Sequence, residues 1–375
     1  MKTIIFLANR GYALKNSRLD IISHFLNAGW KVIACVADDL DGRDLQKMGV
    51  ELEIVPFSRG AALGYSDVKC YFQILSIFSE RSPDLVQAFH AKPVILSALA
   101  AKMLRGIKVS ATITGLGHAF VREGFVSKLA GLGYRVALPS ADVTIFQNSD
   151  DRALFLRKGW LKKCDHKLII GSGVDVARFK FVNRASKVGR PVISMLGRLL
   201  AQKGVNEFIE VADILAEGES PPCFLWAGEI DPVHPDAVAS DCFEGSHAKY
   251  YGHTSDVPDL LGESDIFLFP SYREGVPRAI MEASASGLPT VAFDVPGVRE
   301  VVQTGVTGYL VPFGDVKALA RKVKYLIDNP HVRLEMGKRA RHLVESCFDI
   351  RIINGQYIET YQSLGVDVPD FKVKE

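Results

Sequence analysis

Residues 265–295, DIFLFPSYREGVPRAIMEASASGLPTVAFDV, contain the pattern that decides the fold. An apolar run is followed by a short polar loop, a helix-compatible stretch and a second apolar run. Two buried strands joined by a helix of this length form a parallel βαβ unit. Two acids, Glu274 and Glu282, lie between the strands. They indicate either a helix cap with a solvated face or a pocket that binds hydroxyl groups.

The same alternation of apolar runs and amphipathic stretches extends in both directions along the chain. It predicts buried strands within residues 3–8, 31–37, 52–57, 84–89, 108–114 and 142–148, and again within 191–196, 222–228, 289–295 and 308–313. Strands that alternate with helices form a parallel sheet covered on both faces. We therefore predict the α/β class, with two doubly wound, Rossmann-like parallel-sheet domains that bind ligands at the carboxyl ends of their strands.

The predicted domain boundaries follow from changes in this pattern. Residues 171–191 are rich in Gly, Ser and basic residues and lack sustained periodicity, which is typical of a linker. The predicted parts are an N-terminal domain (1–170), a linker (171–190), a second domain (191–350) and a C-terminal helix that packs back on the first domain (351–375).

Composition excludes several classes of protein. Of 375 residues, 48% are hydrophobic and 23% are charged, which is usual for a globular protein. The six cysteines are widely spaced and never form C-x-x-C, so a disulfide framework or structural zinc is not expected. The apolar start is too short for a signal peptide, and no run approaches the roughly 18 apolar residues of a membrane span. We expect a cytoplasmic protein.

The net charge of +2 conceals an asymmetry. Residues 1–180 carry 25 Lys and Arg against 16 Asp and Glu, a net charge of +9, and the remainder has a net charge of −7. Such asymmetry indicates that the two halves meet different partners, and a basic half suits nucleic acid or an anionic membrane surface. Ordinary variation between domains is the alternative.

The two glutamates are better explained by a binding site than by a cap. Ser271-x-x-Glu274 matches a capping box, but Pro277 favours a helix that begins near its own position. Glu274 then precedes the helix and Glu282 lies about two turns further on. The first amides of the helix, around Gly275, Val276 and Arg278, would form an anion site. A sugar nucleotide requires carboxylates that accept hydrogen bonds from its hydroxyl groups and amides that bind its phosphates.

Basic residues follow the preceding predicted strand. Arg198 and Lys203 are five positions apart in GRLLAQKG, just after the strand PVISML. A guanidinium fork and an ammonium group suit a diphosphate, although two solvated surface bases are the simpler interpretation. His253, in YYGHTSD, follows a third strand end and suits the edge of a base.

Several motifs resemble one known family in the order in which that family has them. GSGVDVARF, GRLLAQKGV, the stretch from PSYREGVPRA to GYLVPFGD, ALARKV and RLEMGKRAR resemble the C-terminal domain of retaining glycosyltransferases of family 4, which have the GT-B fold. The resemblance covers roughly residues 168–345. It implies that Glu274 holds the transferred sugar, that Glu282 holds the ribose diol, and that Arg198 and Lys203 neutralise the departing diphosphate.

The resemblance also implies the wider site and its chemistry. Transfer would retain the anomeric configuration, without metal or other cofactor, and the main catalytic effect would be stabilisation of the leaving phosphate. The implied nucleotide-sugar contacts are Gly197, Arg198, Lys203, Gly228, His253, Glu274, Gly275, Val276, Pro277, Arg278 and Glu282.

The N-terminal half departs from the family pattern. Its first strand is followed by NRGYALKNSR, with Gly11 and Arg18, in place of a glycine-rich turn. A second element is QAFH, which contains His90 and is followed by Lys92. A third has Thr114 where the family has a histidine, and His118 lies four residues further on. We expect Gly11, Arg18, Lys92 and Thr114 on the acceptor side and His90 or His118 in catalysis.

The motifs HAKP and TITGLGHAF most resemble the branch of the family that extends undecaprenyl-diphosphate-linked glycans. This resemblance implies a UDP-sugar donor, with N-acetylgalactosamine as the best candidate sugar, and a lipid-linked saccharide acceptor. The stretch 120–138 is apolar with interspersed bases and would suit an anionic membrane interface as well as an ordinary buried helix. The expected location is the inner face of the cytoplasmic membrane, with neither nucleic acid nor an obligate protein partner.

Four alternatives remain. A nicotinamide-binding domain lacks its G-x-G-x-x-G motif here. Asp39-Leu40-Asp41 matches the D-x-D of metal-dependent glycosyltransferases but is a weak tripeptide signal. The chain would otherwise be a non-catalytic protein that binds a nucleotide sugar, or a transferase with a soluble acceptor.

Overall fold

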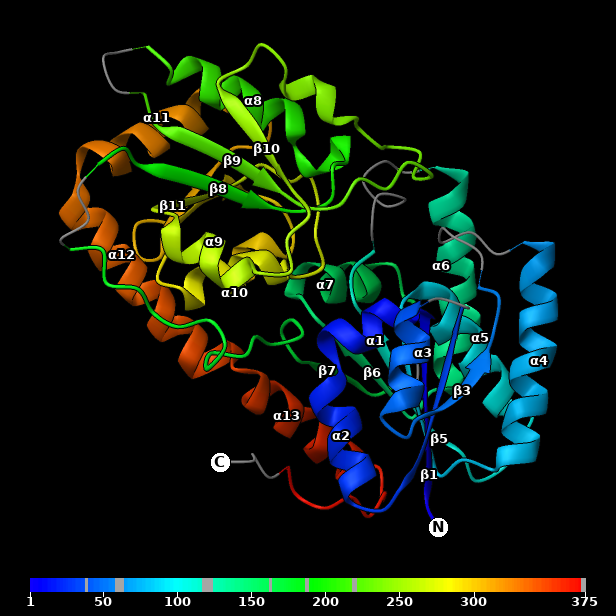
Figure 1. Cartoon of the computed structure of the whole chain (residues 1–375). Helices are drawn as coiled ribbons and strands as arrows, with labels where there is room; N and C mark the ends of the chain where they lie inside the picture. Colours follow the sequence, from blue (N-terminus) through cyan, green and yellow to red (C-terminus); the bar gives the residue numbers. More distant parts are fainter. Residues whose placement is uncertain are drawn as a thin grey trace. The chain divides into compact units, whose positions relative to one another are not determined.

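The structure is a computed structural model that describes residues 1–37, 40–57, 64–116, 124–161, 164–185, 189–217 and 221–371. The chain divides into two compact units. The first consists of Met1–Ser172 together with Arg351–Glu375, and the second is Gly173–Ile350. The C-terminal segment therefore belongs to the same unit as the N-terminus (Figure 1).

The first unit is built on a parallel sheet with the strand order β3-β2-β1-β4-β5-β6-β7 across the described residues. Its central strands are almost wholly buried because helices cover both faces. The strands are β1 (Thr3–Arg10), β2 (Lys31–Ala37), β3 (Glu51–Ile54), β4 (Leu85–Phe89), β5 (Lys108–Ile113), β6 (Val143–Phe146) and β7 (His166–Leu168).

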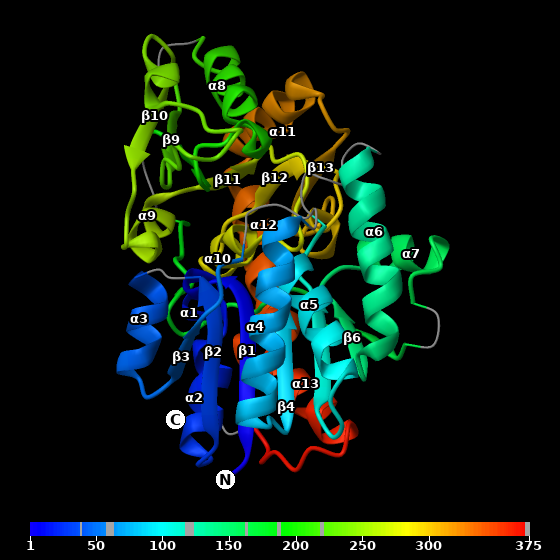
Figure 2. The same cartoon turned by 90° about the vertical axis from the view of Figure 1, so that its right-hand side faces the viewer.

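Two sets of helices cover the faces of this sheet. On one face, residues of α4 (Tyr65–Arg81), α5 (Ala91–Lys102), α6 (Phe125–Ala137) and α7 (Ser149–Arg157) share one hydrophobic cluster. Figure 2 shows α4, α5 and α6 together on this side. On the other face, a second cluster contains residues of the helices α1 (Gly11–Ser17), α2 (Leu19–Asn27), α3 (Leu40–Lys47) and α13 (Ile350–Ser363).

Helix α13 joins the first unit through its apolar and aromatic residues. Ile353, Tyr357 and Tyr361 are buried in the same cluster as Ile4 and Phe25. The hydroxyl of Tyr361 donates to Gln87 Oε1 of β4 at 2.8 Å. The last helix of the chain therefore completes the core of the domain that the first strand begins.

The second unit contains a parallel sheet with the order β10-β9-β8-β11-β12-β13 in the described chain. Its strands are β8 (Val192–Leu196), β9 (Cys223–Ala227), β10 (Ala248–Gly252), β11 (Ile266–Phe269), β12 (Thr290–Phe293) and β13 (Gly308–Val311). Its helices are α8 (Val205–Ile214), α9 (Val257–Glu263), α10 (Arg278–Ala285), α11 (Val316–Asp328) and α12 (Pro330–Leu343). Helix α8 packs on α11 and α9 packs on α10, on opposite faces of the sheet (Figure 1).

The two parallel, helix-covered sheets confirm the predicted α/β class with two doubly wound domains. Strand β7 was not predicted, and β10 was expected only as the strand end before His253. Both are edge strands with exposed positions, so neither has the continuous apolar run that marks a central strand.

The segment predicted as a linker, 171–190, is largely part of the second unit. Arg184 is buried there, and its guanidinium donates to the carbonyls of Leu261, Ser264 and Ser286 at 2.6–2.9 Å. Burial lowers the pKa of Arg184 to about 10. These hydrogen bonds fix the segment to the second domain, so it does not act as a free connection.

Candidate functional site

Loops that follow neighbouring strands of the second sheet meet at its carboxyl edge. Gly197 follows β8, Gly228 follows β9 and His253 follows β10. Backbone hydrogen bonds continue past the strand ends, from Gly197 N to Ala227 O at 2.9 Å and from Gly228 N to Gly252 O at 3.0 Å. The predicted binding positions of this domain therefore lie side by side on the edge where open α/β sheets bind ligands.

Two glycines allow these loops to approach each other closely. A Cβ atom on Gly228 would lie 2.0 Å from the carbonyl oxygen of Gly197. A Cβ atom on Gly297, which has φ +82°, would lie 2.1 Å from the carbonyl oxygen of Gly275. Only glycine fits at such distances, so Gly297 supports the loop that carries Glu274 from the side of β12.

Lys203 and Glu274 form an ion pair at this edge. Lys203 ends the short 3₁₀ turn Ala201–Lys203, and its Nζ lies 2.5 Å from Glu274 Oε1. Ser271 Oγ donates to the same oxygen at 2.6 Å. Both charged side chains are largely buried, with exposed fractions of 22% and 14%. Within the described residues Glu274 Oε2 has no hydrogen-bond partner, so one carboxylate oxygen is held in place and the other is available.

Helix α10 begins directly after Pro277, as the proline predicted. Glu274 consequently lies in the preceding loop with Gly275 and Val276, and its bond to Ser271 is not part of a capping box. The first amides of the helix have no acceptor inside it and form a potential anion site. No such donor comes from Pro277, which lacks an N–H group.

Glu282 lies on the first turns of α10 and pairs with Arg278. Arg278 Nε donates to Glu282 Oε1 at 2.9 Å, and both side chains are less than one fifth exposed. Burial raises the pKa of Glu282, and the nearby Arg278 opposes this shift. In the described chain Arg278 Nη1 is buried without a partner, and Glu282 Oε2 makes no hydrogen bond. The pair thus retains unsatisfied hydrogen-bonding capacity.

Arg198 and His253 are the exposed members of this group. Arg198 Nη1 lies 3.1 Å from Asp231 Oδ2, and its side chain is 45% exposed. His253 Nδ1 lies 3.8 Å from Glu229 Oε1 and is 62% exposed. Asp231 was not predicted, because a lone acid in a loop gives no sequence signal. It holds a guanidinium that remains accessible to a ligand.

Sequence reasoning also missed a half-buried pair that includes Tyr272, a residue of the same loop as Glu274. The hydroxyl of Tyr272 donates to Glu207 Oε1 at 2.5 Å, which joins the loop after β11 to the first turn of α8. Burial and the neighbouring Glu207 raise the pKa of Tyr272 to about 12. This hydrogen bond fixes Tyr272, which lies between Ser271 and Glu274 in the chain, to helix α8.

In the first unit, Arg18 lies buried between two aromatic rings. Its guanidinium carbon is 4.5 Å from the centre of the Phe89 ring and 5.0 Å from that of Tyr357. The side chain is 3% exposed, and Nη1 has no hydrogen-bond partner within the described residues. A buried guanidinium with an unsatisfied nitrogen is a suitable partner for an anion or a hydroxyl group.

His90 directly follows β4 and has an unusual backbone conformation. Its φ and ψ angles are 70° and 165°, a region that side-chain-bearing residues rarely occupy. Burial, together with Arg18, lowers the pKa of His90 to about 4, so the imidazole is neutral near pH 7. Asn9 lies near the end of β1, the strand that pairs with β4. Asn9 Oδ1 and His90 Nδ1 are both buried without a partner in the described structure.

The remaining predicted residues of this domain differ in their surroundings. Lys92 is 2% exposed, and its Nζ lies 2.8 Å from Asp67 Oδ2, so it links α5 to α4. Its place on the acceptor side stays a prediction. Thr114 follows β5 and is half-buried, and Gly11 is the buried first residue of α1. His118 lies outside the described residues.

The described ranges contain neither a metal-binding cluster nor a membrane-spanning helix. No group of three or more His, Cys, Asp or Glu side chains is placed to hold a metal ion there. Asp41, from the D-x-D tripeptide, pairs with Lys15 at 3.0 Å, and Asp39 lies outside the described residues. None of the helices described is both long and apolar enough to cross a membrane.

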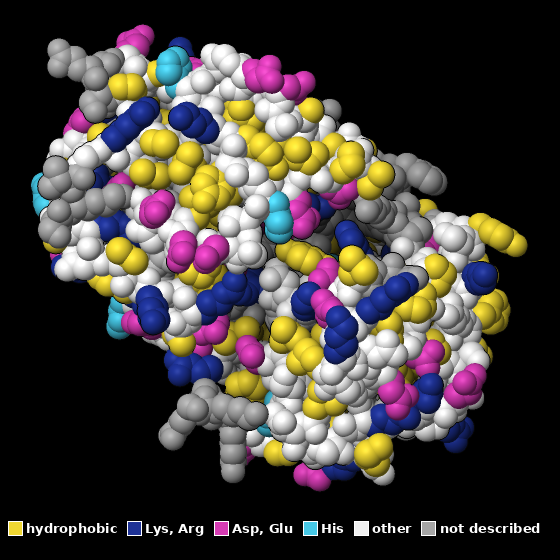
Figure 3. All heavy atoms as spheres, viewed as in Figure 1, with side chains coloured by type: hydrophobic (Ala, Val, Ile, Leu, Met, Phe, Trp, Pro, Cys, Tyr) yellow, Lys and Arg dark blue, Asp and Glu magenta, His cyan; other side chains and the backbone are white. Residues whose placement is uncertain are grey.

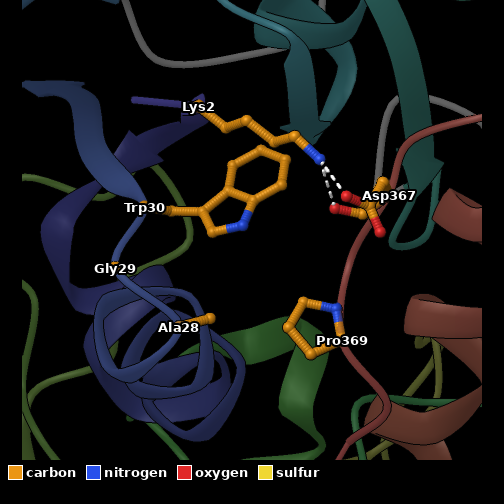
Figure 4. A pocket seen from close by; sticks show the side chains of 6 residues that line it. All are labelled: Lys2, Ala28, Gly29, Trp30, Asp367 and Pro369. Atoms are coloured by element: carbon orange, nitrogen blue, oxygen red, sulfur yellow. Dashed lines mark hydrogen bonds and ion pairs between the residues drawn. The ribbon is translucent and has the colours of Figure 1, made fainter.

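A hollow of about 350 Å³ lies at the amino ends of the strands of the first sheet (Figure 4). Lys2 precedes β1 and Trp30 precedes β2, so both mark the amino ends of the strands. Lys2 Nζ pairs with Asp367 Oδ2 at 2.5 Å and lies 5.5 Å from the centre of the Trp30 ring. This hollow shares no residue with the groups described above, and parallel sheets bind ligands at the other edge.

The domain models of two families match the chain. Residues 16–163 match the "Glycosyl transferase 4-like domain" and residues 177–343 match "Glycosyl transferases group 1". The chain is 26% identical over 95% of its length, and over 97% of the relative, to N,N'-diacetylbacillosaminyl-diphospho-undecaprenol alpha-1,3-N-acetylgalactosaminyltransferase of Campylobacter jejuni. It is 24% identical, over 76% of each chain, to UDP-Gal:alpha-D-GlcNAc-diphosphoundecaprenol alpha-1,3-galactosyltransferase of Escherichia coli.

Solved structures share the fold along nearly the whole chain. Anabaena Alr3699/HepE in complex with UDP-glucose superposes with a TM-score of 0.77 at 21% identity, over 97% of this chain and 100% of that one. Sucrose-phosphate synthase from Thermosynechococcus elongatus superposes with a TM-score of 0.75 at 18% identity, over 97% and 99%.

Proposed function

We propose that this chain, which belongs to the glycosyltransferases with a 4-like N-terminal domain and a group 1 C-terminal domain and has the GT-B fold, moves a sugar from a UDP-sugar to an undecaprenyl-diphosphate-linked saccharide. The product would be a glycan of the cell surface or its precursor. N-acetylgalactosamine is the best candidate sugar, because the Campylobacter jejuni relative named for that transfer aligns over nearly the full length of both chains.

The observation that carries this proposal is the Lys203–Glu274 pair at the carboxyl ends of β8 and β11. Glu274 Oε1 is held by Lys203 and Ser271, which leaves Oε2 to accept a hydrogen bond from a hydroxyl of the transferred sugar. Glu282 on α10 would similarly accept from the ribose. These two carboxylates, with the first amides of α10 between them, match the polar parts of a nucleotide sugar.

In the proposed reaction the bond from the anomeric carbon to the diphosphate oxygen breaks and the acceptor oxygen takes its place. Arg198 and Lys203 stabilise the negative charge that develops on the diphosphate, which is the largest contribution the site can make. The leaving phosphate takes the acceptor's proton, and the acceptor oxygen attacks from the face that the diphosphate leaves. A protein nucleophile is then not required, and the anomeric configuration is retained. The reaction is expected to need no metal ion.

The first unit would supply the acceptor side. Arg18 and His90 lie at the carboxyl edge of the first sheet and have buried nitrogens without partners in the described chain. We expect them to orient the acceptor, together with Thr114, and we keep His118 as a second candidate for catalysis. A lipid-linked acceptor would place the protein peripherally on the inner face of the cytoplasmic membrane.

The test is a transfer assay with UDP- and GDP-sugars and short-chain undecaprenyl-diphosphate saccharides, with the product linkage determined by NMR. One UDP-sugar should be transferred, and the product should have an α linkage if the glycosidic bond of the donor is α. The rate of transfer should be the same with and without EDTA. Transfer from GDP-sugars alone would overturn the donor assignment, and transfer to a free saccharide alone would overturn the acceptor. UDP binding without transfer to any acceptor would favour a non-catalytic nucleotide-sugar-binding protein.

A further inference from the structure

Helix α4 exposes a stripe of large apolar side chains. Tyr65, Val68 and Phe72 have exposed fractions of 95%, 52% and 61%, and Lys69 is exposed among them. Positions i, i+3, i+4 and i+7 lie on one face of a helix. The opposite face of α4 packs into the core, where Cys70, Ile74 and Phe78 are buried. Much of the apolar surface of the stripe therefore lies outside the packing of its own domain.

Helix α6 has a stripe of the same kind. Leu132 and Val136 are 57% and 52% exposed, and Lys128 and Arg135 are exposed beside them. These four positions again share one face of the helix, while Tyr134 on the other face is buried in the core. Helices α4 and α6 thus present the same mixture of apolar and basic side chains.

The two stripes belong to one layer of the first unit. Both α4 and α6 pack on α5, and α5 is almost wholly buried between them. Figure 2 shows the three helices on one side of the sheet, and Figure 3 shows hydrophobic and basic side chains interleaved along the outer side of α4. We call Tyr65, Val68, Lys69, Phe72, Lys128, Leu132, Arg135 and Val136 together the α4–α6 surface.

The charge of this surface has one sign. Helix α6 contains no acidic residue, and Asp67 of α4 is buried in its pair with Lys92. The other acid of α4, Glu80, lies more than two turns beyond Phe72, outside the α4–α6 surface. Aromatic and aliphatic side chains among unopposed cations are the composition of protein surfaces that enter the headgroup region of an anionic bilayer. Patches of exposed large apolar residues are otherwise uncommon on soluble proteins.

We propose that the α4–α6 surface docks the protein on an anionic lipid bilayer, with Tyr65, Phe72 and Leu132 in the interface and the basic side chains against lipid phosphates. The proposal rests on the proposed function, because a lipid-linked acceptor lies in such a membrane. It adds the specific surface that holds the enzyme there.

The experiment measures co-sedimentation of the full chain with vesicles of phosphatidylcholine alone and with added phosphatidylglycerol. The Phe72→Ser/Leu132→Ser variant removes apolar contacts, and Lys69→Glu/Lys128→Glu reverses charge. The matched control is Lys102→Glu/Met103→Ser, because Met103 is 67% exposed on the same helical layer at the other end of α5. We expect the wild type and the control to bind only vesicles containing phosphatidylglycerol, and both test variants to bind them about tenfold or more weakly.

Two further readouts keep this result separate from the proposed function. Transfer to a water-soluble short-chain acceptor should be unchanged in all variants, because no residue of the surface is in the proposed site. Equal vesicle binding by wild type and both test variants, or binding that is indifferent to phosphatidylglycerol, would overturn the docking surface and leave the transferase proposal intact. A change in oligomeric state by light scattering, without a change in vesicle binding, would instead assign the surface to self-association.

Discussion

Lys203 and Glu274 are 71 positions apart in the chain, yet their charged groups are 2.5 Å apart at the carboxyl ends of two adjacent strands. The pair lies in a largely buried setting, and Ser271 donates to the same carboxylate oxygen. The cation and the anion therefore hold each other in fixed positions. A ligand that contacts both finds its phosphate and hydroxyl partners already oriented, which lowers the cost of binding and of reaction.

Glu274→Gln should reduce kcat about 100- to 1,000-fold and change the Kd of UDP only a few-fold. The amide keeps the shape of the side chain but loses the charge that holds Lys203. Glu282→Gln is the matched comparison, and it should weaken UDP about tenfold because it alters the ribose contact. Steady-state kinetics and titration calorimetry measure both. Equal effects of the two variants on kcat and on UDP affinity would contradict the separate roles.

Arg198→Ala should weaken UDP about tenfold or more and leave the affinity for uridine unchanged. The guanidinium is exposed beside Asp231 and is proposed to contact only the diphosphate, where charge-assisted hydrogen bonds are strongest. Calorimetry with UDP and uridine distinguishes the two contributions. A parallel loss of both affinities would mean that Arg198 supports the fold of the site and not the diphosphate.

Gly297→Ala should abolish UDP-sugar binding or weaken it at least about tenfold. The new methyl group would collide with the carbonyl of Gly275 and displace the loop that carries Glu274. Gly305→Ala is the control, because Gly305 has φ +79° but a Cβ added there would have no atom within 4 Å. Both variants bear the backbone strain of about 1–2 kcal/mol, and only the first carries the collision. Similar UDP affinities in the two variants would disprove the support role of Gly297.

His90 should make the free energy of unfolding fall as the pH falls from 6.5 to 4. The pKa of His90 is about 4 in the folded chain and about 6.5 when unfolded, so the unfolded state binds more protons in this range. The loss is up to about 1.4 kcal/mol for each pH unit. Urea unfolding at several pH values, compared with His90→Gln, isolates the contribution. His90→Gly should in addition be more stable than His90→Ala, because glycine tolerates the observed φ.

Lys92→Met should destabilise the first domain by about 3–5 kcal/mol, because it leaves the carboxylate of Asp67 buried and unpaired. Lys92→Met/Asp67→Leu should recover part of this loss. Lys108→Met breaks a more exposed pair with Asp142 and should cost less than about 1 kcal/mol. Denaturant unfolding curves test all three. A small effect of Lys92→Met on stability with a large effect on acceptor KM would support the acceptor role predicted from the sequence.

The sequence predicted the central strands because each is a continuous apolar run that a doubly covered sheet requires. Edge strands β7 and β10 lacked this signal because half of their surface is exposed. At the candidate site, Pro277 was enough to separate Glu274 from the helix that carries Glu282, since proline constrains the backbone locally. Asp231 and Asn9 gave no signal, because neither lies in a local pattern.

The sequence by itself determined the two parallel-sheet domains, the start of α10 and the set of residues at the strand ends. These features depend on periodicity and on the backbone chemistry of single residues, which act over a few positions. Only the tertiary structure decided the partners: Lys203 with Glu274, Lys92 with Asp67, and Arg18 between two rings, one of them from the last helix. Such contacts join residues far apart in the chain, and their geometry exists only once the strands have aligned.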